Sequence, residues 1–353
     1  MIHGGDTLTY KDHYDGELID FSSNINPLGT PEGLHEKLIE GFETLTAYPD
    51  IEYRKLKDSI AEYLDCAYEN VLVGNGAMEI IDNFIMIGKR VVTTMPAFAE
   101  YSLRAKAHGK ELKQIPYKDD FNIDIKVIRD TIKKDDLLVL GNPNNPTGLR
   151  IEKNTLLELY NMVSEREAYL LLDEAFHEFV PYDYDSIQLF KGYNYKNVGI
   201  IRAATKFFAL PGIRLGYACA AEDKVEEIED IQLPWSINAL GDIAGQYIFR
   251  DKEYIERSKE YIENERQYIS KELSKISWLK TYPTQTNFQL IKLNKLDEDY
   301  LFKYFLSRGI VIRKCSSFLG LDKQYIRIAI RSRKDNEKLI NIFKELTKEV
   351  EDK

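Results

Sequence analysis

The sequence predicts an α/β protein with a large domain built on a mostly parallel, doubly wound sheet and a smaller α+β domain. Between residues 71 and 220, short apolar runs rich in β-branched residues alternate with segments of helical periodicity, which is typical of βαβ units. Near residue 233 this alternation stops and a long helical stretch begins. The 353 residues, 44% of them hydrophobic, are enough for one large core and a second, smaller one.

Composition argues against several classes of protein. The formal net charge is −10 and the basic residues are dispersed among acids, so no nucleic-acid partner is expected. Cys66, Cys219 and Cys315 lie far apart without metal or redox spacing, which favours a reduced, cytoplasmic protein. The segment after Met1 is polar and no apolar run approaches the length of a membrane span, so we expect neither a signal peptide nor a membrane. The five histidines lack metal-binding spacing, and no metal is expected.

The first seventy-odd residues contain turns before the first strand. The run 20–29 concentrates Asn, Pro and Gly, and is either a plain turn, which we favour, or backbone placed against a ligand. Apolar residues from Leu56 to Leu64 fall at helical spacing. A strand over 71–73 then leads through a glycine turn into a helix from about Ala77. The open N–H groups of that helix start could bind an anion, although a simple β–α turn explains the glycines equally well.

The alternating region continues with six further strands and the helices between them. The expected strands cover 91–94, 112–116, 137–140, 168–172, 198–201 and 215–220, and the helices 98–103, 125–132 and 152–165. Polar residues follow several of these strands directly, notably the Asn- and Pro-rich turn 141–148. Ligands of doubly wound sheets bind at this carboxyl edge, so we expect a site there.

Two charged residues at that edge suggest a particular chemistry. Lys206 follows the strand over 198–201, and burial there would lower its pKa and make the amine nucleophilic. Arg214, eight residues later, could bind a phosphate, so the pair suggests a phosphorylated carbonyl cofactor held as a Schiff base. A solvated surface lysine is the alternative. Asp173 ends a buried strand and needs a positive partner, either a protonated ring nitrogen or an internal arginine.

The remaining chain is expected to form the second domain. After Pro234, an aromatic and aliphatic stripe predicts a long helix over 254–273. Strands at 288–293, 310–312 and 325–330 are interleaved with helices at 297–309 and 334–349. Arg313 follows one of these strands. Arg327 points opposite its apolar neighbours, and faces either water or an interdomain cleft.

These elements resemble the fold-type-I pyridoxal-phosphate enzymes of the class I/II aminotransferase family. The motifs that carry the resemblance are Asn145-Pro146-Thr147-Gly148, Asp173-Glu174-Ala175, and Thr205-Lys206 with Arg214. It implies an aspartate-aminotransferase-like fold whose small domain uses both chain ends. The implied division is an amino-terminal arm over 1–45, a large cofactor-binding domain over 46–233, and a linking helix with the small domain over 234–353.

The resemblance also implies roles for individual residues around pyridoxal 5'-phosphate. Lys206 would carry the cofactor as a Schiff base and move protons, Asp173 would pair with the pyridine nitrogen, and Asn145 would bond the ring oxygen. The remaining cofactor contacts would be Gly76, Ala77, Met78, Thr205 and Arg214 around the phosphate, Phe98 against the ring, and Tyr48 from the second subunit of a homodimer. Phe176, where tyrosine is common, and Ala203, where serine is common, depart from the pattern.

Within the family, two groups that act on phosphorylated amino compounds compete. The sequence is more similar to threonine-phosphate decarboxylases of cobalamin biosynthesis, whose similarity extends to Phe176, than to histidinol-phosphate aminotransferases. The candidate substrate contacts are His3 and Gly4 in a lid, Asn24, Arg313, Arg327 and Arg331. A cofactor-sensing regulator and an α/β protein without cofactor remain as alternatives from other classes.

Overall fold

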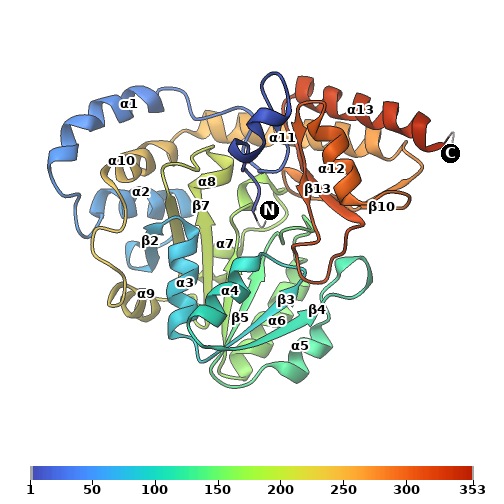
Figure 1. Ribbon diagram of the computed structural model, residues 1–353. Helices are drawn as coiled ribbons and strands as arrows, with labels where there is room; N and C mark the ends of the chain where they lie inside the picture. The colour runs from blue at the N-terminus through green and yellow to red at the C-terminus, as the bar shows by residue number, and fades with distance from the viewer. Residues whose placement is uncertain (1–2, 352–353) are drawn as a thin grey trace.

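The computed structural model describes residues 3–351 and contains a large body and a smaller one beside its upper edge (Figure 1). The large body is built on a seven-stranded sheet of order β2-β8-β7-β6-β5-β3-β4. These strands are β2 (Val71–Asn75), β8 (Leu215–Cys219), β7 (Val198–Ala203), β6 (Tyr169–Asp173), β5 (Asp136–Gly141), β3 (Arg90–Met95) and β4 (Glu111–Pro116). The pairs that β8 forms with β2 and β7 are antiparallel and the other described pairs of this sheet are parallel, which confirms the mostly parallel sheet.

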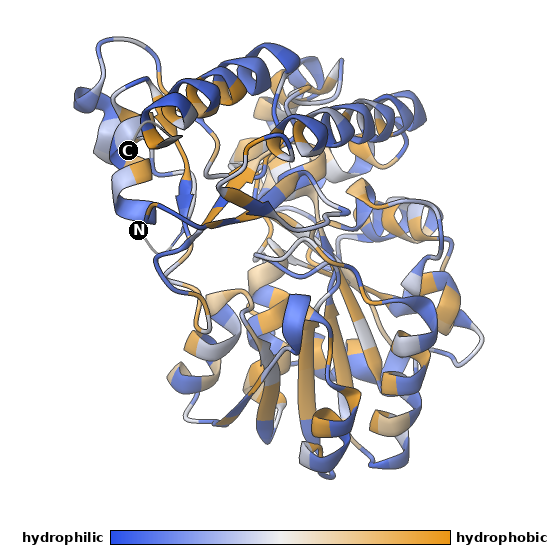
Figure 2. Cartoon of the chain, turned by 90° about the vertical axis from the view of Figure 1, so that its right-hand side faces the viewer, coloured by the Kyte–Doolittle hydropathy of each residue, from blue (hydrophilic) through white to orange (hydrophobic). Residues whose placement is uncertain are grey.

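Helices cover both faces of this sheet, as a doubly wound fold requires. Successive residues of β5 show it, because Leu138 packs into one core and Val139 into another on the opposite face. The helices are α2 (Arg54–Leu64), α3 (Ala77–Ile87), α4 (Ala99–Ala107), α5 (Ile125–Thr131), α6 (Lys153–Glu165), α7 (Ser186–Lys191), α8 (Ala204–Phe207) and α9 (Glu222–Glu229). Figure 2 shows apolar strands between helices whose outer faces are hydrophilic.

The smaller body combines both ends of the chain. Its antiparallel sheet has the order β12-β13-β10-β9, formed by β12 (Arg313–Lys314), β13 (Tyr325–Ala329), β10 (Phe288–Leu293) and β9 (Leu279–Thr281). The helices α11 (Lys252–Leu273), α12 (Glu298–Leu306) and α13 (Arg333–Glu351) pack beside it. The amino-terminal strand β1 (Ile19–Asp20) pairs in parallel with β11 (Ile310–Val311), which confirms that the small domain uses both chain ends.

Helix α1 (Leu34–Gly41) was not expected from the sequence. Its start at Gly33 has no side-chain cap, so no sequence signal marks it. It packs against α10 (Ala239–Ile248), and both helices contribute residues to the core of the large body. The expected boundaries at 45 and 233 would assign α1 to the amino-terminal arm and α10 to the segment with the small domain. The division into domains stays a prediction.

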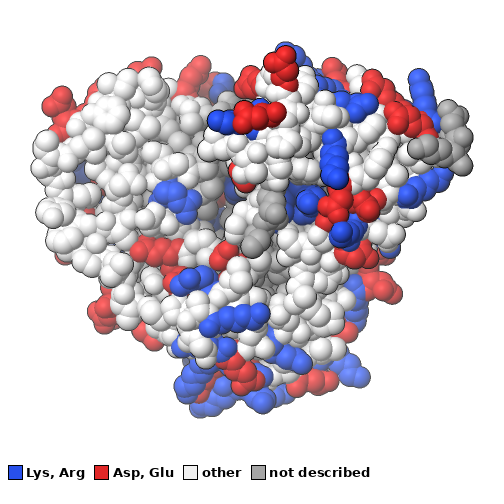
Figure 3. Space-filling view, in the orientation of Figure 1, with Lys and Arg blue, Asp and Glu red and all other residues white. Residues whose placement is uncertain are grey.

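Short 3-10 turns and the molecular surface complete the architecture. The turns cover Leu8–His13, Phe42–Thr46, Tyr68–Asn70, Asp119–Phe121 and His177–Phe179. On the face shown in Figure 3, acidic and basic side chains are interleaved. None of the helices within residues 3–351 combines the length and apolarity that a bilayer span requires.

Candidate active site

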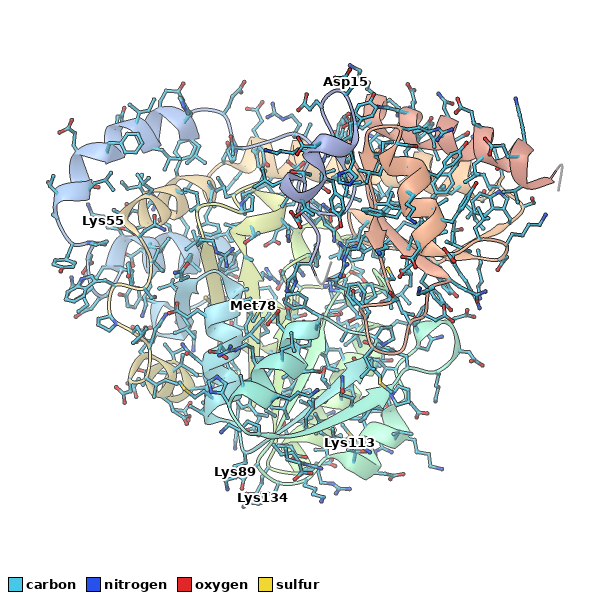
Figure 4. The ribbon with its side chains drawn as sticks, in the orientation of Figure 1. Asp15, Lys55, Met78, Lys89, Lys113 and Lys134 are labelled. Carbon is cyan, nitrogen blue, oxygen red and sulfur yellow. The ribbon has the colours of Figure 1, made fainter. Side chains whose placement is uncertain are left out.

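A cavity of about 240 Å³ lies at the carboxyl edge of the large sheet, between the two bodies. Figure 4 places Met78, one of its lining residues, near the centre of the molecule, whereas Lys89 and Lys134 lie at the far end of the sheet. The predicted site residues that line the cavity are His3, Gly4, Asn24, Ala77, Met78, Phe98, Asn145, Asp173, Thr205, Lys206, Arg214, Arg313 and Arg327. The fold therefore brings together most of the residues selected from the sequence.

Lys206 lies in the short helix α8, directly after β7. Burial, together with the positive charges of Arg327 and Arg214, lowers the pKa of its amine from the ordinary value to about 8. The carbonyl oxygen of Lys206 accepts a hydrogen bond of 3.0 Å from the backbone N–H of Asn26. The side chain of Asn26 donates to the carbonyl of Phe207 at 2.8 Å. The Asn-rich turn thus holds the lysine segment in place through these two hydrogen bonds. The interpretation of this run as a plain turn was therefore incomplete.

Asp173 ends β6 and has a phenol, not a cation, as its partner. The Tyr101 hydroxyl donates to its Oδ2 at 2.5 Å and the Ala175 N–H to its Oδ1 at 3.1 Å. Burial raises the pKa of Asp173 above its ordinary value. Within residues 3–351 no ion pair reaches Asp173, and the neighbouring internal arginine, Arg202, instead binds Glu174 at 3.0 Å. A positive ligand group beside this carboxyl would stabilise its ionised form.

A compact anion cradle is formed where α3 begins. Gly76 precedes the helix with a φ of 74°, and a Cβ there would lie 2.4 Å from Nη2 of Arg214. A Cβ on Gly216 of β8 would lie 2.3 Å from the backbone nitrogen of Ala77. Both glycines thus let Arg214 and the helix start come together. Open N–H groups, a helix dipole and a guanidinium at one place fit a phosphate group.

The opposite wall carries two arginines on neighbouring strands. Arg313 of β12 and Arg327 of β13 are direct cross-strand partners, and both are buried. Arg327 donates to the Ser22 carbonyl at 2.7 Å and to Asn145 Oδ1, while its buried Nε has no partner. Burial lowers the pKa of Arg327 to about 10. Arg313 donates to Ser317 Oγ at 2.8 Å. Two guanidinium groups this close favour bound anions between or beside them.

The amino-terminal segment forms one side of the cavity. His3 Nε2 lies 3.0 Å from a carboxylate oxygen of Glu100, and its ring meets Phe98 edge-on at 6.1 Å. Gly4 packs so closely that a Cβ would lie 2.0 Å from the Ser22 carbonyl oxygen. Asn24 is buried, and its side-chain Oδ1 has no hydrogen-bond partner. These positions are consistent with a wall or lid over the site.

Three of the predicted site residues, Arg331, Tyr48 and Gly76, do not line the cavity. Arg331 donates to the Asp20 carbonyl at 3.0 Å and pairs with Asp335 at 3.2 Å, so it braces the small domain. Tyr48 is 80% exposed, with its ring 4.6 Å from that of Trp235. Gly76 lies directly before α3, against Arg214, in the anion cradle described above.

Some site residues were missed from the sequence. Tyr101 follows Phe98 by three residues, and this helical spacing could have indicated that both rings face the site. Ser22, Ser317 and Phe318 also line the cavity. Ser22 belongs to the run 20–29, for which contact with a ligand was the alternative to a plain turn, whereas nothing in the local sequence of Ser317 and Phe318 signals their position.

Comparison with known proteins gives a consistent set of relatives. The sequence model described as "Aminotransferase class I and II" matches residues 16–343. A protein of Caldanaerobacter subterraneus, provisionally named a threonine-phosphate decarboxylase, is 38% identical over 98% of this chain and 94% of its own. The threonine-phosphate decarboxylase of Salmonella typhimurium is 32% identical, covering 96% and 94%. The solved histidinol-phosphate aminotransferase of Clostridium acetobutylicum is 36% identical with a TM-score of 0.90, covering 94% of this chain and 100% of its own.

Proposed function

Because the chain belongs to the class I and II aminotransferase family, we propose that it is a pyridoxal-phosphate enzyme that decarboxylates L-threonine O-3-phosphate to (R)-1-aminopropan-2-ol phosphate in cobalamin biosynthesis. The observation that carries the proposal is the buried cross-strand pair Arg313 and Arg327 in the cavity of Lys206. The substrate carries a carboxylate and a phosphate at once, so it needs two cationic positions. The names of the relatives at 38% and 32% identity support decarboxylation.

The residues present fit pyridoxal 5'-phosphate. Bound there, the cofactor would supply an electron sink for the bond broken at the substrate's Cα. Arg214 and the N–H groups at the start of α3 would bind its phosphate, and Asp173 would hold a proton on its ring nitrogen. Lys206 would attach it, because an amine with a pKa of about 8 is substantially neutral at mildly alkaline pH. Asn145, Thr205 and Phe98 line the same cavity and would contact its ring and phosphate.

The arginine wall would orient the substrate. Arg327 is held by Ser22 and Asn145, so it would present the carboxylate in one fixed direction. Decarboxylation requires the bond to the carboxylate to stand perpendicular to the cofactor ring, and a fixed guanidinium can impose that direction. Arg313 with Ser317 would bind the substrate phosphate, with His3 closing over it. Lys206 would then deliver a proton to Cα after carbon dioxide leaves.

A homodimer is part of the proposal. Large apolar side chains are exposed around α1 and the turn before α2, with Tyr48 80%, Leu45 54% and Ile51 52% exposed. Leu233, 75% exposed, lies two residues before Trp235, whose ring contacts that of Tyr48. Exposed apolar surface of this kind marks a subunit interface, and Tyr48 would reach the cofactor phosphate of the second subunit. Cys66, Cys219 and Cys315 are free thiols, which supports a cytoplasmic location.

Histidinol-phosphate aminotransferase is the second candidate, favoured by the similarity to the Clostridium acetobutylicum enzyme at 36% identity. In that reaction Arg327 would bind the carboxylate of 2-oxoglutarate in one half-reaction only.

Parallel assays of the cofactor-loaded protein separate the two. The proposal predicts CO2 release from L-threonine O-3-phosphate and no 2-oxoglutarate-dependent loss of histidinol phosphate. The reverse pattern would establish the aminotransferase, and an absorbance spectrum would show in the same sample that cofactor is bound.

A further inference from the structure

A short loop of the large body, directly after β4, reaches across to the small domain. Figure 1 shows the chain after β4 beside that domain. Phe121 of this loop meets the rings of Tyr282 and Tyr325 edge-on, at centroid distances of 5.0 and 6.4 Å. Its neighbour Asp120 forms an ion pair of 2.9 Å with Lys280. The loop therefore joins the two bodies through an aromatic contact and a charged one.

The backbone of this loop has an unusual conformation. Asp120 and Phe121 have φ angles of 56° and 63°, in the left-handed region, which a bulky side chain rarely adopts. The Phe121 N–H donates to the Lys118 carbonyl at 3.1 Å, and the Lys118 N–H donates to the Asn122 carbonyl at 2.8 Å. The loop is thus closed on itself in a strained form. Such conformations cluster at positions with a functional role, so the placement of the Phe121 ring needs an explanation beyond a simple connection.

The small core that Phe121 joins includes part of the wall of the catalytic cavity. Its buried members are Tyr282, Leu290, Cys315 and Phe318, and the partly buried residues packed against them are Phe121, Leu321 and Tyr325. Three of these residues, Cys315, Phe318 and Leu321, belong to the segment that follows β12. A residue of the large body therefore helps to bury the side chains of a small-domain segment.

That segment in turn holds Arg313. Ser317 and Phe318 line the catalytic cavity together with Arg313. Ser317 Oγ accepts a hydrogen bond of 2.8 Å from Arg313 Nη2, and the centre of the Phe318 ring lies 5.1 Å from the guanidinium carbon. Phe121 itself is not among the residues that line this cavity. Any influence of Phe121 on a bound substrate must therefore pass through the segment that holds Arg313.

We propose that Phe121 is a positioning residue for the phosphate end of the substrate site. By completing the small core, its ring keeps Phe318 and Ser317 against Arg313, so that the guanidinium has one fixed direction in the cavity. The inference rests on the proposed function, in which Arg313 binds the substrate phosphate. Loss of the ring would leave a gap in this core, and the segment after β12 would open more often. The phosphate would then be bound less tightly, while the groups around Lys206 stay in place.

Hydrogen exchange of the cofactor-loaded protein tests the link between the loop and the segment, whatever the substrate is. The N–H groups of Phe318 and Leu321 donate to the carbonyls of Cys315 and Phe318 at 2.9 and 3.0 Å, so their exchange reports on the segment. In Phe121→Ala we expect exchange at least about fivefold faster than in wild type. Phe121→Tyr, which keeps the ring, should exchange as wild type does. Tyr304→Ala is the matched control, because Tyr304 is a partly buried aromatic residue on the other core of the small domain and does not line the cavity.

Steady-state kinetics with L-threonine O-3-phosphate test the consequence for the site. Phe121→Ala should raise KM about tenfold and change kcat less than about twofold, because only binding is affected. Phe121→Tyr and Tyr304→Ala should keep both constants. If circular dichroism shows that Phe121→Ala is unfolded, Phe121→Leu takes its place, and the same directions are expected.

Unchanged exchange in the segment of a folded Phe121 variant would overturn the proposal. Faster exchange with an unchanged KM, or a fall in kcat at constant KM, would overturn it as well. A wild-type enzyme that releases no CO2 would count against the proposed function, and the exchange rates alone would then decide whether Phe121 positions the segment.

Discussion

Replacing Tyr101 by phenylalanine tests the role of Asp173 more specifically than replacing Asp173 itself. The change removes the hydroxyl that donates to Asp173 Oδ2 at 2.5 Å and keeps the ring that meets Phe98 at a centroid distance of 5.7 Å. A hydrogen bond to a charged group contributes about 1.5–3 kcal/mol. The ionised carboxyl of Asp173 would keep the ring nitrogen of the cofactor protonated during turnover. Loss of this hydrogen bond should therefore lower kcat about tenfold to a hundredfold.

The pH profile shows whether the loss has this cause. The Tyr101 hydroxyl stabilises the ionised carboxyl, so its removal raises the pKa of Asp173 above a value that burial has already raised. Activity on the acid side should therefore disappear at a higher pH than in wild type. Tyr160→Phe, a buried tyrosine of the large core outside the cavity, is the control and should behave as wild type. A Tyr101→Phe enzyme with unchanged kcat and an unchanged acid limb would refute the role given to this hydroxyl.

Four further changes have defined outcomes. Asp173→Asn should raise the melting temperature of the cofactor-free protein, since it removes a buried carboxyl without a cation, and should abolish turnover; a lower melting temperature would contradict this. In the cofactor-free protein, modification of Lys206 by an amine reagent should rise with pH around a midpoint near 8, as the amine loses its proton, and a midpoint near that of the surface lysines would count against burial. Gly76→Ala should weaken cofactor binding at least about tenfold, because its Cβ would meet Arg214 and its φ is positive, as equilibrium dialysis would show. Arg313→Gln should raise KM for the phosphorylated substrate with little change in kcat, and equal losses for a substrate without phosphate would argue against a phosphate contact.

The convergence of the candidate site residues could be predicted from the sequence. Asp173, Lys206 and the turn containing Asn145 each follow an apolar run, and parallel strands place their carboxyl ends at one edge. The sequence also indicated a glycine turn before α3, but it did not show why a glycine is needed there. The close approach of Gly76 to Arg214 depends on the pairing of β2 with β8, whose ends are far apart in the sequence.

The positions of Arg313, Arg327 and Arg331 could not be predicted from the sequence alone. The sequence allows Arg327 to face either water or a cleft. In the structure Arg327 pairs across the strands with Arg313, is buried, and lines the cavity. Alternation along a strand would place Arg331 on the same side as Arg327. However, β13 ends at Ala329, and the chain then enters α13, so Arg331 turns back onto the Asp20 carbonyl. Helix α1 escaped detection for a related reason, because its stability depends on packing against the distant α10.

Turnover without an oxo acid distinguishes decarboxylation from transamination in a single assay. The cofactor-loaded protein is incubated with an excess of carboxyl-labelled L-threonine O-3-phosphate, with no 2-oxo acid present, and the labelled CO2 is counted against the amount of enzyme. A decarboxylase regenerates itself in every cycle, so we expect many equivalents of CO2 per active site and the same amount of amino-propanol phosphate. A yield of no labelled CO2 from protein that holds its cofactor, with histidinol phosphate consumed once 2-oxoglutarate is added, would contradict it.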